Sequence, residues 1–156
     1  LVLDFFGLPQ LKWMLSEETS LLSIIIVFVW KMLGYNIMII LAALQSVPRE
    51  VYEAAKMDRA GQVKTFFHVT IPMISPTLVF LITNNVTSSF CSFDIIDLMT
   101  KGGPKNSSNM MVYWIYENAF SYYRVGPAMA GAVMLLMLVG SISVLVFTIS
   151  NRKAHY

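Results

Sequence analysis

The chain has 156 residues, of which 56% are hydrophobic and 13% are charged, whereas a soluble domain has about a quarter of its residues charged. This composition excludes an ordinary soluble domain and indicates a membrane protein. The net charge of +2 is too small to suggest a nucleic-acid partner. One cysteine, Cys91, excludes a disulfide within the chain, and with only His68 and His155 beside it the sequence predicts no metal site.

Three apolar stretches are long enough to cross a bilayer as helices, which takes roughly 20 residues at about 1.5 Å rise per residue. They cover about residues 21–44, 72–93 and 127–149. The fold class is therefore predicted to be an all-α polytopic helical bundle. A loop at about 45–70 and a connection at about 94–126 separate the three spans. The chain begins with Leu1 and lacks the order of a signal peptide, so we expect it to be the later part of a longer polypeptide.

Basic residues near the ends of the spans predict the orientation, because cytoplasmic loops carry more lysine and arginine. One side of the membrane has Arg49, Lys56, Arg59, Lys64, Arg152 and Lys153. The other side has Lys12, Lys101, Lys105 and Arg124. This difference places the loop at 45–70 and the C-terminus in the cytoplasm, and the N-terminal arm and the connection at 94–126 outside.

The loop is predicted to form two short amphipathic helices. Pro48 and Glu50 suit the first turn of a helix that runs to about Arg59. Helical spacing places small side chains in the middle of one face, which consists of Val51, Ala54, Ala55 and Asp58. After Gly61, a second helix would carry Val63, Phe66, Phe67 and Thr70 on one face. From this pattern alone, the pair is either a docking element for a partner or a connector resting on lipid headgroups.

The first two spans contain candidate residues for a solute path. In the second span, four polar residues recur at helical spacing, namely Asn85, Ser88, Ser89 and Ser92. They line a wet path for a polar solute or pack this helix against another one through small polar side chains. In the first span, Trp30, Leu33 and Ile37 share a face near Gly34, and this face meets either the path or lipid.

Small residues at the start of the third span predict close packing against another helix. They form two pairs, Gly126 with Ala130 and Ala128 with Ala132.

No motif for nucleotide binding or hydrolysis occurs in the sequence. It contains no G-x-x-x-x-G-K-[ST] phosphate loop, no G-x-S-x-G elbow and no H-E-x-x-H pair. We therefore predict that the chain is not an enzyme and holds no cofactor, and that a partner handles ATP.

The polar segment from Tyr52 to Gly61, followed by Val69 to Pro72, resembles the cytoplasmic loop of ABC importer permeases. That loop has Glu-Ala-Ala, a glycine shortly after it, and then a Leu-Pro-like pair. Three further segments resemble permeases for sugars, related polyols or glycerophosphates: Phe93-Asp94, Thr100 to Pro104 and Tyr113 to Phe120. The resemblance covers nearly the whole chain and implies a permease core of about six spans, of which three are present here.

In this family the loop inserts into a groove of an ATPase. The resemblance gives this coupling role to Glu53, Ala54, Ala55, Asp58, Arg59 and Gly61. Arg59 stands where the family usually has a glycine, and Gly61 is an alternative place for the turn. The resemblance also implies solute contacts from the polar residues of the second span and from Trp30, Leu33, Gly34 and Ile37.

The implied function is ATP-driven import of a sugar or related solute. The implied partners are a cytoplasmic ABC ATPase that binds ATP and Mg, a second permease subunit, an extracytoplasmic solute-binding protein and the lipid bilayer. The implied location is the plasma membrane of a bacterium or archaeon, which is the inner membrane in a Gram-negative cell. Two alternatives are a secondary transporter or channel, which Lys31 alone supports, and a non-transporting membrane adaptor.

Overall fold

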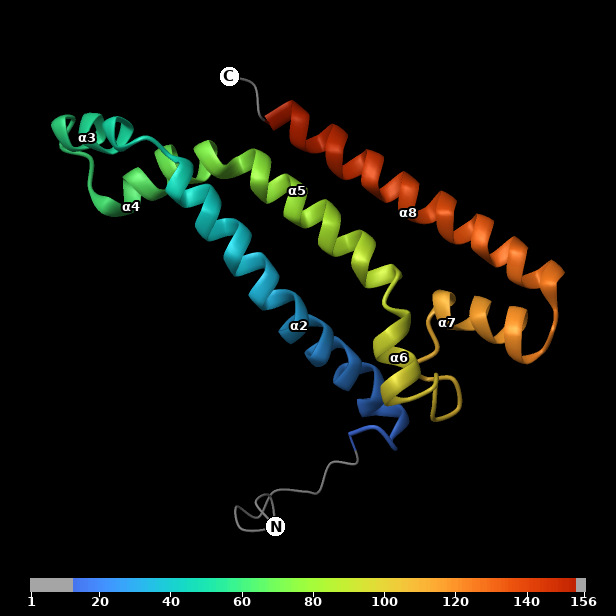
Figure 1. The fold of residues 1–156 in the computed structure, drawn as a ribbon. Helices are drawn as coiled ribbons and strands as arrows, with labels where there is room; N and C mark the ends of the chain where they lie inside the picture. The colour runs from blue at the N-terminus through green and yellow to red at the C-terminus, as the bar shows by residue number, and fades with distance from the viewer. Residues whose placement is uncertain (1–12, 154–156) are drawn as a thin grey trace, which may run out of the picture. The chain divides into compact units, whose positions relative to one another are not determined.

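The computed structural model describes residues 13–153, with the side chains of residues 13–148, and every regular element among them is a helix (Figure 1). The all-α fold class is therefore confirmed. Lys12 and His155, and the side chains of Arg152 and Lys153, entered the sequence predictions and lie outside these described parts.

Three helices are long and apolar enough to cross a membrane: Glu17–Ser46, Gln62–Phe90 and Val125–Thr148. The first is α2 (Glu17–Ser46), and the third is the greater part of α8 (Val125–Lys153). Most of their large apolar side chains are exposed. Exposed apolar surface of this extent marks a surface that lipid or other protein covers, which agrees with membrane helices.

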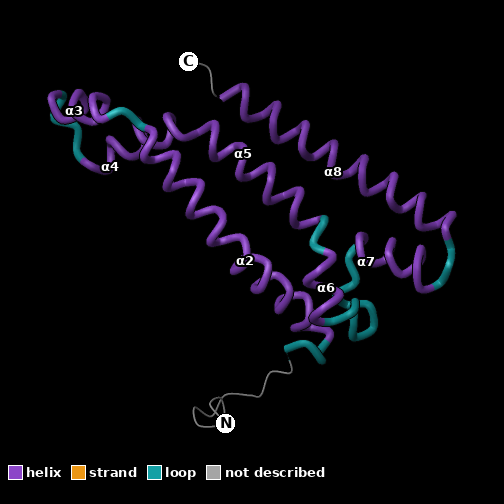
Figure 2. The backbone as a smooth tube through the Cα atoms, in the orientation of Figure 1, coloured by secondary structure: helices purple, strands orange, loops and turns teal. Residues whose placement is uncertain are grey.

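The second long helix differs from the predicted range of 72–93 at both ends. It begins with α4 (Gln62–Thr65), continues through the π-helical turn η1 (Phe66–Thr70) and becomes α5 (Ile71–Phe90). Figure 2 shows the loop that follows α5 before the next helix begins. There the Phe93 N–H donates to the carbonyl oxygen of Cys91 (2.8 Å), and α6 (Phe93–Met99) starts. Phe90, Cys91 and Phe93 keep this stretch partly apolar through the turn, so hydropathy alone does not reveal it.

The described residues fall into two compact units, and each is considered by itself. One unit comprises residues 13–30 and Ser89–Val139, and the other comprises Lys31–Ser88 and residues 140–153. The core of the first unit is formed by Ile24, Ile95, Ile96 and Tyr113. Around it, α7 (Met111–Tyr116) and the π-helical turn η2 (Glu117–Ser121) contribute aromatic rings. The rings of Phe93 and Tyr116 lie 4.7 Å apart between centroids.

Close packing in the first unit is centred on Gly131 of α8. A Cβ atom at Gly131 would lie 2.8 Å from Cζ3 of Trp114 and 3.1 Å from Cγ1 of Ile115. Ala128, one turn earlier, is 3% exposed, whereas Gly126 and Ala130 are exposed. The predicted pair Gly126 with Ala130 therefore does not pack within this unit, because these residues lie on another side of the helix from Gly131.

Candidate functional site

The loop between the first two long helices forms the helical hairpin that the sequence predicts. In the second unit, α3 (Arg49–Met57) begins after Pro48 and ends at Asp58. The Arg59 N–H donates to the carbonyl oxygen of Lys56 (3.0 Å), and the Ala60 N–H donates to that of Ala55 (3.0 Å). With Arg59 at φ +51°, these two bonds form a Schellman motif, which normally has glycine in the left-handed position.

Gly61 is not the residue that makes the turn. Its backbone is extended, with φ −66° and ψ 158°, and it forms the N-cap of α4. Any L-residue adopts this conformation, and a Cβ atom at Gly61 would meet nothing within 4 Å. The alternative that placed the turn at Gly61 is therefore wrong, because the left-handed residue is Arg59, where the resembling family has its glycine.

The residues assigned to coupling divide between an outer and an inner surface of the hairpin. Glu53, Ala54 and Asp58 are exposed, as are Arg59 and Gly61. Ala55 is only 9% exposed, so it packs within the chain. The predicted single face therefore needs correction: Ala54 and Asp58 are open to a partner, whereas Ala55 is covered by this chain itself. The coupling role of these residues stays a prediction.

The second helix of the hairpin presents aromatic and aliphatic side chains outward. Val63 is 73% exposed, Phe66 47% and Phe67 61%. The rings of Phe66 and Phe67 meet edge to face, with 5.1 Å between their centroids. Thr70 does not share this exposed face, because it is 6% exposed and its hydroxyl donates to the Tyr52 hydroxyl (3.3 Å). That bond ties α3 to the base of the second helix.

A pair of asparagine side chains links α2 and α5 within the second unit. Nδ2 of Asn85 donates to Oδ1 of Asn36 (3.0 Å), and Nδ2 of Asn36 donates to Oδ1 of Asn85 (3.4 Å). Nearby, the hydroxyls of Thr87 and Ser143 lie 3.4 Å apart, which links α5 to α8. Asn85 thus has the packing contact that was one of its two predicted roles. Its partner Asn36 was not among the predicted site residues, although an amide inside an apolar helix is a usable signal.

The remaining residues predicted for a solute path do not gather at one described site. Ser92 lies beyond the end of α5, at the start of α6, and is 7% exposed. Ser88 belongs to the second unit and Ser89 to the first. Trp30 is 78% exposed, Leu33 51% and Ile37 53%, and a Cβ atom at Gly34 would meet nothing within 4 Å. Their contact with solute stays a prediction.

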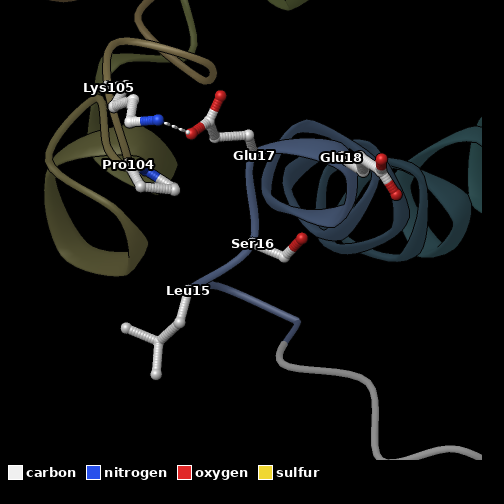
Figure 3. A pocket seen from close by; sticks show the side chains of 6 residues that line it. All are labelled: Leu15, Ser16, Glu17, Glu18, Pro104 and Lys105. Atoms are coloured by element: carbon white, nitrogen blue, oxygen red, sulfur yellow. Dashed lines mark ion pairs between the residues drawn. The ribbon is translucent and has the colours of Figure 1, made fainter.

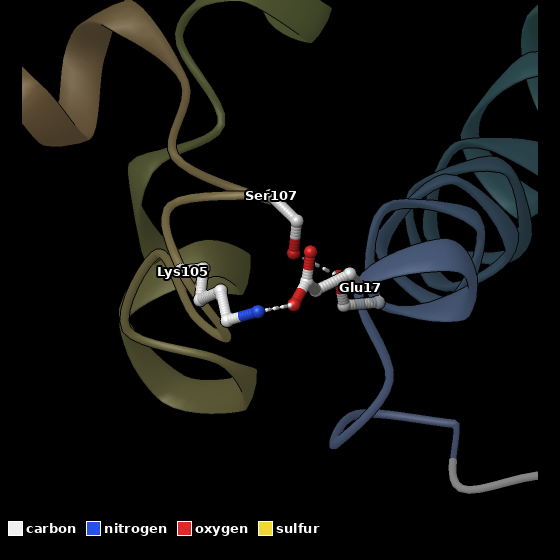
Figure 4. Close-up of polar contacts among 4 residues, drawn as sticks. Glu17, Lys105 and Ser107 are labelled. Carbon is white, nitrogen blue, oxygen red and sulfur yellow. Dashed lines mark hydrogen bonds and ion pairs between the residues drawn. The ribbon is translucent and has the colours of Figure 1, made fainter.

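The connection after α6 is joined to the start of α2 in the first unit. Nζ of Lys105 lies 2.6 Å from Oε1 of Glu17, and the hydroxyls of Ser20 and Ser107 lie 2.8 Å apart (Figure 4). Both members of the ion pair are more than half exposed, so the pair contributes about 0 to 1 kcal/mol. Glu17 and Lys105 also line an open pocket, together with Leu15, Glu18 and Pro104 (Figure 3).

Ionisable side chains in the described part of the chain form no metal site. No group of three or more histidine, cysteine, aspartate or glutamate side chains there could hold a metal ion. Burial raises the pKa of the Tyr113 hydroxyl above its usual value of 10.0, and the charges of Glu117 and Asp97 add to this effect. Tyr113 therefore stays neutral, as a core residue does.

Comparisons with known proteins agree with the membrane architecture. The family described as "Binding-protein-dependent transport system inner membrane component" matches residues 1–156. The chain is 37% identical over 159 residues to the sn-glycerol-3-phosphate transport system permease protein UgpA of Pectobacterium atrosepticum. It is 38% identical over 159 residues to the protein of the same name from Yersinia enterocolitica. Both matches cover 100% of this chain and 54% of the relative, so the chain spans about half the length of these relatives.

Two solved structures share the fold. One is a bacterial ABC transporter involved in the import of the acidic polysaccharide alginate, and the match has a TM-score of 0.85 at 22% identity. The other is a bacterial alginate ABC transporter in complex with alginate pentasaccharide-bound periplasmic protein, with the same TM-score and identity. The matches cover 99% and 98% of this chain and 54% of each matched chain. At this identity the likeness concerns the fold alone.

Proposed function

Because this chain belongs to the family of binding-protein-dependent transport system inner membrane components, we propose that it contributes part of a permease subunit of an ATP-driven importer. Its long helices form part of the path for a sugar or a related solute. Its hairpin at α3 and α4 couples that path to a cytoplasmic ATPase. The relatives named for sn-glycerol-3-phosphate transport support a small hydroxyl-bearing solute.

The observation that carries this proposal is the unbroken helix from Gln62 to Phe90. Its first turns hold the exposed Val63 and Phe67, and its later turns are long and apolar enough to cross a membrane. A push on the hairpin therefore moves the spanning part of the helix directly, without a loop to absorb the motion. The Thr70–Tyr52 hydrogen bond (3.3 Å) makes α3 move with it.

The remaining parts of the system follow from the same proposal. ATP and Mg are bound by the ATPase, and this chain holds neither. A second permease subunit completes the path, and a solute-binding protein delivers the solute from outside. The excess of basic residues around the hairpin supports a cytoplasmic position for it, in the plasma membrane of a bacterium or archaeon. Labelling of Lys64→Cys by a membrane-impermeant reagent only from inside would agree with this orientation.

The alternative functions find less support. A secondary transporter needs ionisable groups inside its spans, and between residues 21 and 44 Lys31 is the one such residue. If the chain were a non-transporting adaptor, changes in the hairpin would leave solute uptake unaltered. The following experiment separates the adaptor from the permease.

The test is ATP-dependent uptake by the complete complex in proteoliposomes. Ala54 is the better site for steric exclusion, because Ala55 is buried and a large side chain there would disturb the hairpin itself. We expect Ala54→Trp and Glu53→Lys to reduce uptake, since both residues are exposed. Glu18→Lys changes the charge of the chain equally at another exposed site and is the matched control. Normal uptake by both hairpin variants would contradict the coupling role.

A further inference from the structure

The first unit contains a polar pocket that the coupling function does not use. It has a volume of about 280 Å³ and lies between the connection after α6 and the helical segment α7–η2. Its lining includes Asn109, Trp114, Glu117, Asn118, Tyr122 and Arg124. Ligand pockets in proteins run from about 300 to 1,000 Å³, so this one suits a molecule at the small end of that range.

Residues that line the pocket are held in place by contacts with one another and with α8. Trp114 packs on Gly131 so closely that a Cβ atom there would come within 2.8 Å of its ring. Nδ2 of Asn118 donates to the carbonyl oxygen of Trp114 (2.9 Å), and the Arg124 N–H donates to that of Asn118 (2.7 Å). Tyr123 has φ +53°, a left-handed conformation that bulky residues rarely adopt and that clusters at functional sites. The pocket is thus preorganised.

One buried polar atom beside the pocket lacks a partner. Nδ2 of Asn109 donates to Oε2 of Glu117 (3.0 Å), whereas Oδ1 of Asn109 is buried and accepts no hydrogen bond in the described structure. Buried polar atoms are nearly always hydrogen-bonded in native proteins, and an exception asks for an explanation such as an ordered water. That oxygen has almost no exposed surface, so a molecule in the pocket meets the other polar groups of the lining. Hydroxyls suit those groups, because a hydroxyl donates to a carboxylate or amide oxygen and accepts from a guanidinium or an amide N–H.

The charged and aromatic side chains of the lining narrow the chemical class of the ligand further. Glu117 and Arg124 both line the pocket, so the formal charge of the lining is balanced and gives an anion no net attraction. Trp114 and Tyr122 add aromatic side chains to the lining. A sugar ring has hydroxyls at its edge for the amides and charged groups and an apolar C–H face for an aromatic side chain.

We propose that this pocket binds one neutral, hydroxyl-rich molecule of the size of a monosaccharide or small polyol. The role of the pocket rests on the proposed import function: it holds solute outside the membrane before the solute enters the path. Binding itself does not depend on transport, so the two ideas can fail separately.

Binding is measured on the complete permease–ATPase complex in nanodiscs, without the solute-binding protein, by saturation-transfer NMR. The probes are D-glucose, glycerol and sn-glycerol 3-phosphate. We expect saturable binding of glucose or glycerol that weakens about tenfold in Glu117→Gln, because a hydrogen bond to a charged acceptor becomes one to a neutral acceptor. Glu18→Gln, at an exposed carboxylate outside the pocket, is the matched control and should bind like the unaltered protein.

A second variant guards against an effect of Glu117→Gln on folding. Tyr122→Ala removes an exposed ring that does not belong to the core, and it should weaken binding of the neutral probes while the complex remains assembled. Unaltered binding in both variants, or tighter binding of sn-glycerol 3-phosphate than of the neutral probes, would overturn the proposal. ATP-dependent uptake by a complex that binds no probe would refute the pocket and leave the import function standing. Probe binding without any uptake would refute the import function and leave the pocket standing.

Discussion

Replacing Arg59 with glycine is expected to stabilise the turn after α3. Arg59 has φ +51°, and a left-handed conformation costs an L-residue roughly 1 to 2 kcal/mol. Glycine avoids that cost but loses about 0.5 to 1 kcal/mol more conformational entropy on folding. The difference leaves a net gain of about 0.5 to 1 kcal/mol for Arg59→Gly, which corresponds to a two- to fivefold change in the opening equilibrium.

Hydrogen exchange of the amide hydrogens reports this opening directly. The amides of Arg59 and Ala60 make the two bonds that close the turn, so a peptide containing them should exchange about two- to fivefold more slowly in Arg59→Gly. Two controls isolate the backbone effect. Arg59→Ala removes the charge and keeps a left-handed L-residue, and Gly61→Ala adds a methyl group where φ is −66° and the space is open. Both should change exchange much less than Arg59→Gly.

Exchange in Arg59→Gly that is as fast as in the unaltered protein, or faster, would refute a cost of the left-handed backbone at Arg59. Equal slowing by Arg59→Ala would also contradict it, because the effect would then belong to the arginine side chain. If the turn sets the position of the exposed coupling residues, Arg59→Gly should maintain or raise solute-stimulated ATPase activity in the complete complex.

Three further predictions concern packing in each unit. Asn36→Leu and Asn85→Leu should each lower the thermal stability of the purified complex. A double-mutant cycle should give a coupling energy of about 0.5 to 1.5 kcal/mol between the two residues, and strictly additive effects would contradict a hydrogen bond between their amides. Gly131→Ala should destabilise by about 1 to 3 kcal/mol and shift tryptophan fluorescence, because its methyl group meets Trp114, whereas Gly126→Ala should be nearly neutral. The raised pKa of Tyr113 means that the unfolded chain loses this proton first as pH rises, so stability should fall above about pH 10. Tyr113→Phe should lessen that fall, and an unchanged alkaline profile would refute the assignment.

The sequence predicted the features that depend on composition and periodicity. The three long apolar helices and the hairpin between the first two follow from hydropathy and from the polar interruption at Glu53 and Asp58. The choice between Arg59 and Gly61 as the turn residue did not follow from the sequence, because arginine by itself gives no signal for a left-handed backbone. Neither did the burial of Ala55, since helical spacing shows which residues share a face but not which face the rest of the chain covers.

The pocket between the connection and α7–η2 was also beyond sequence reasoning. Its residues are scattered from Asn106 to Arg124 and have no common period, because a loop, a helix and a π-helical turn each supply some of them. The signal that was present is the density of asparagine and aromatic residues after Lys101-Gly102-Gly103-Pro104. Gly102 has φ +77°, and a Cβ atom there would lie 3.3 Å from Asn109 and Tyr113, a constraint that only the structure reveals.

The central claim is that the hairpin couples a solute path to ATP hydrolysis by a partner. Solute-stimulated ATPase activity and solute uptake, measured together on the complete complex in proteoliposomes, test it most directly. The account predicts that Ala54→Trp lowers uptake and separates it from ATP hydrolysis, while the complex with Glu18→Lys behaves like the unaltered one. Uptake and stimulated hydrolysis that both remain normal in Ala54→Trp and Glu53→Lys would contradict it.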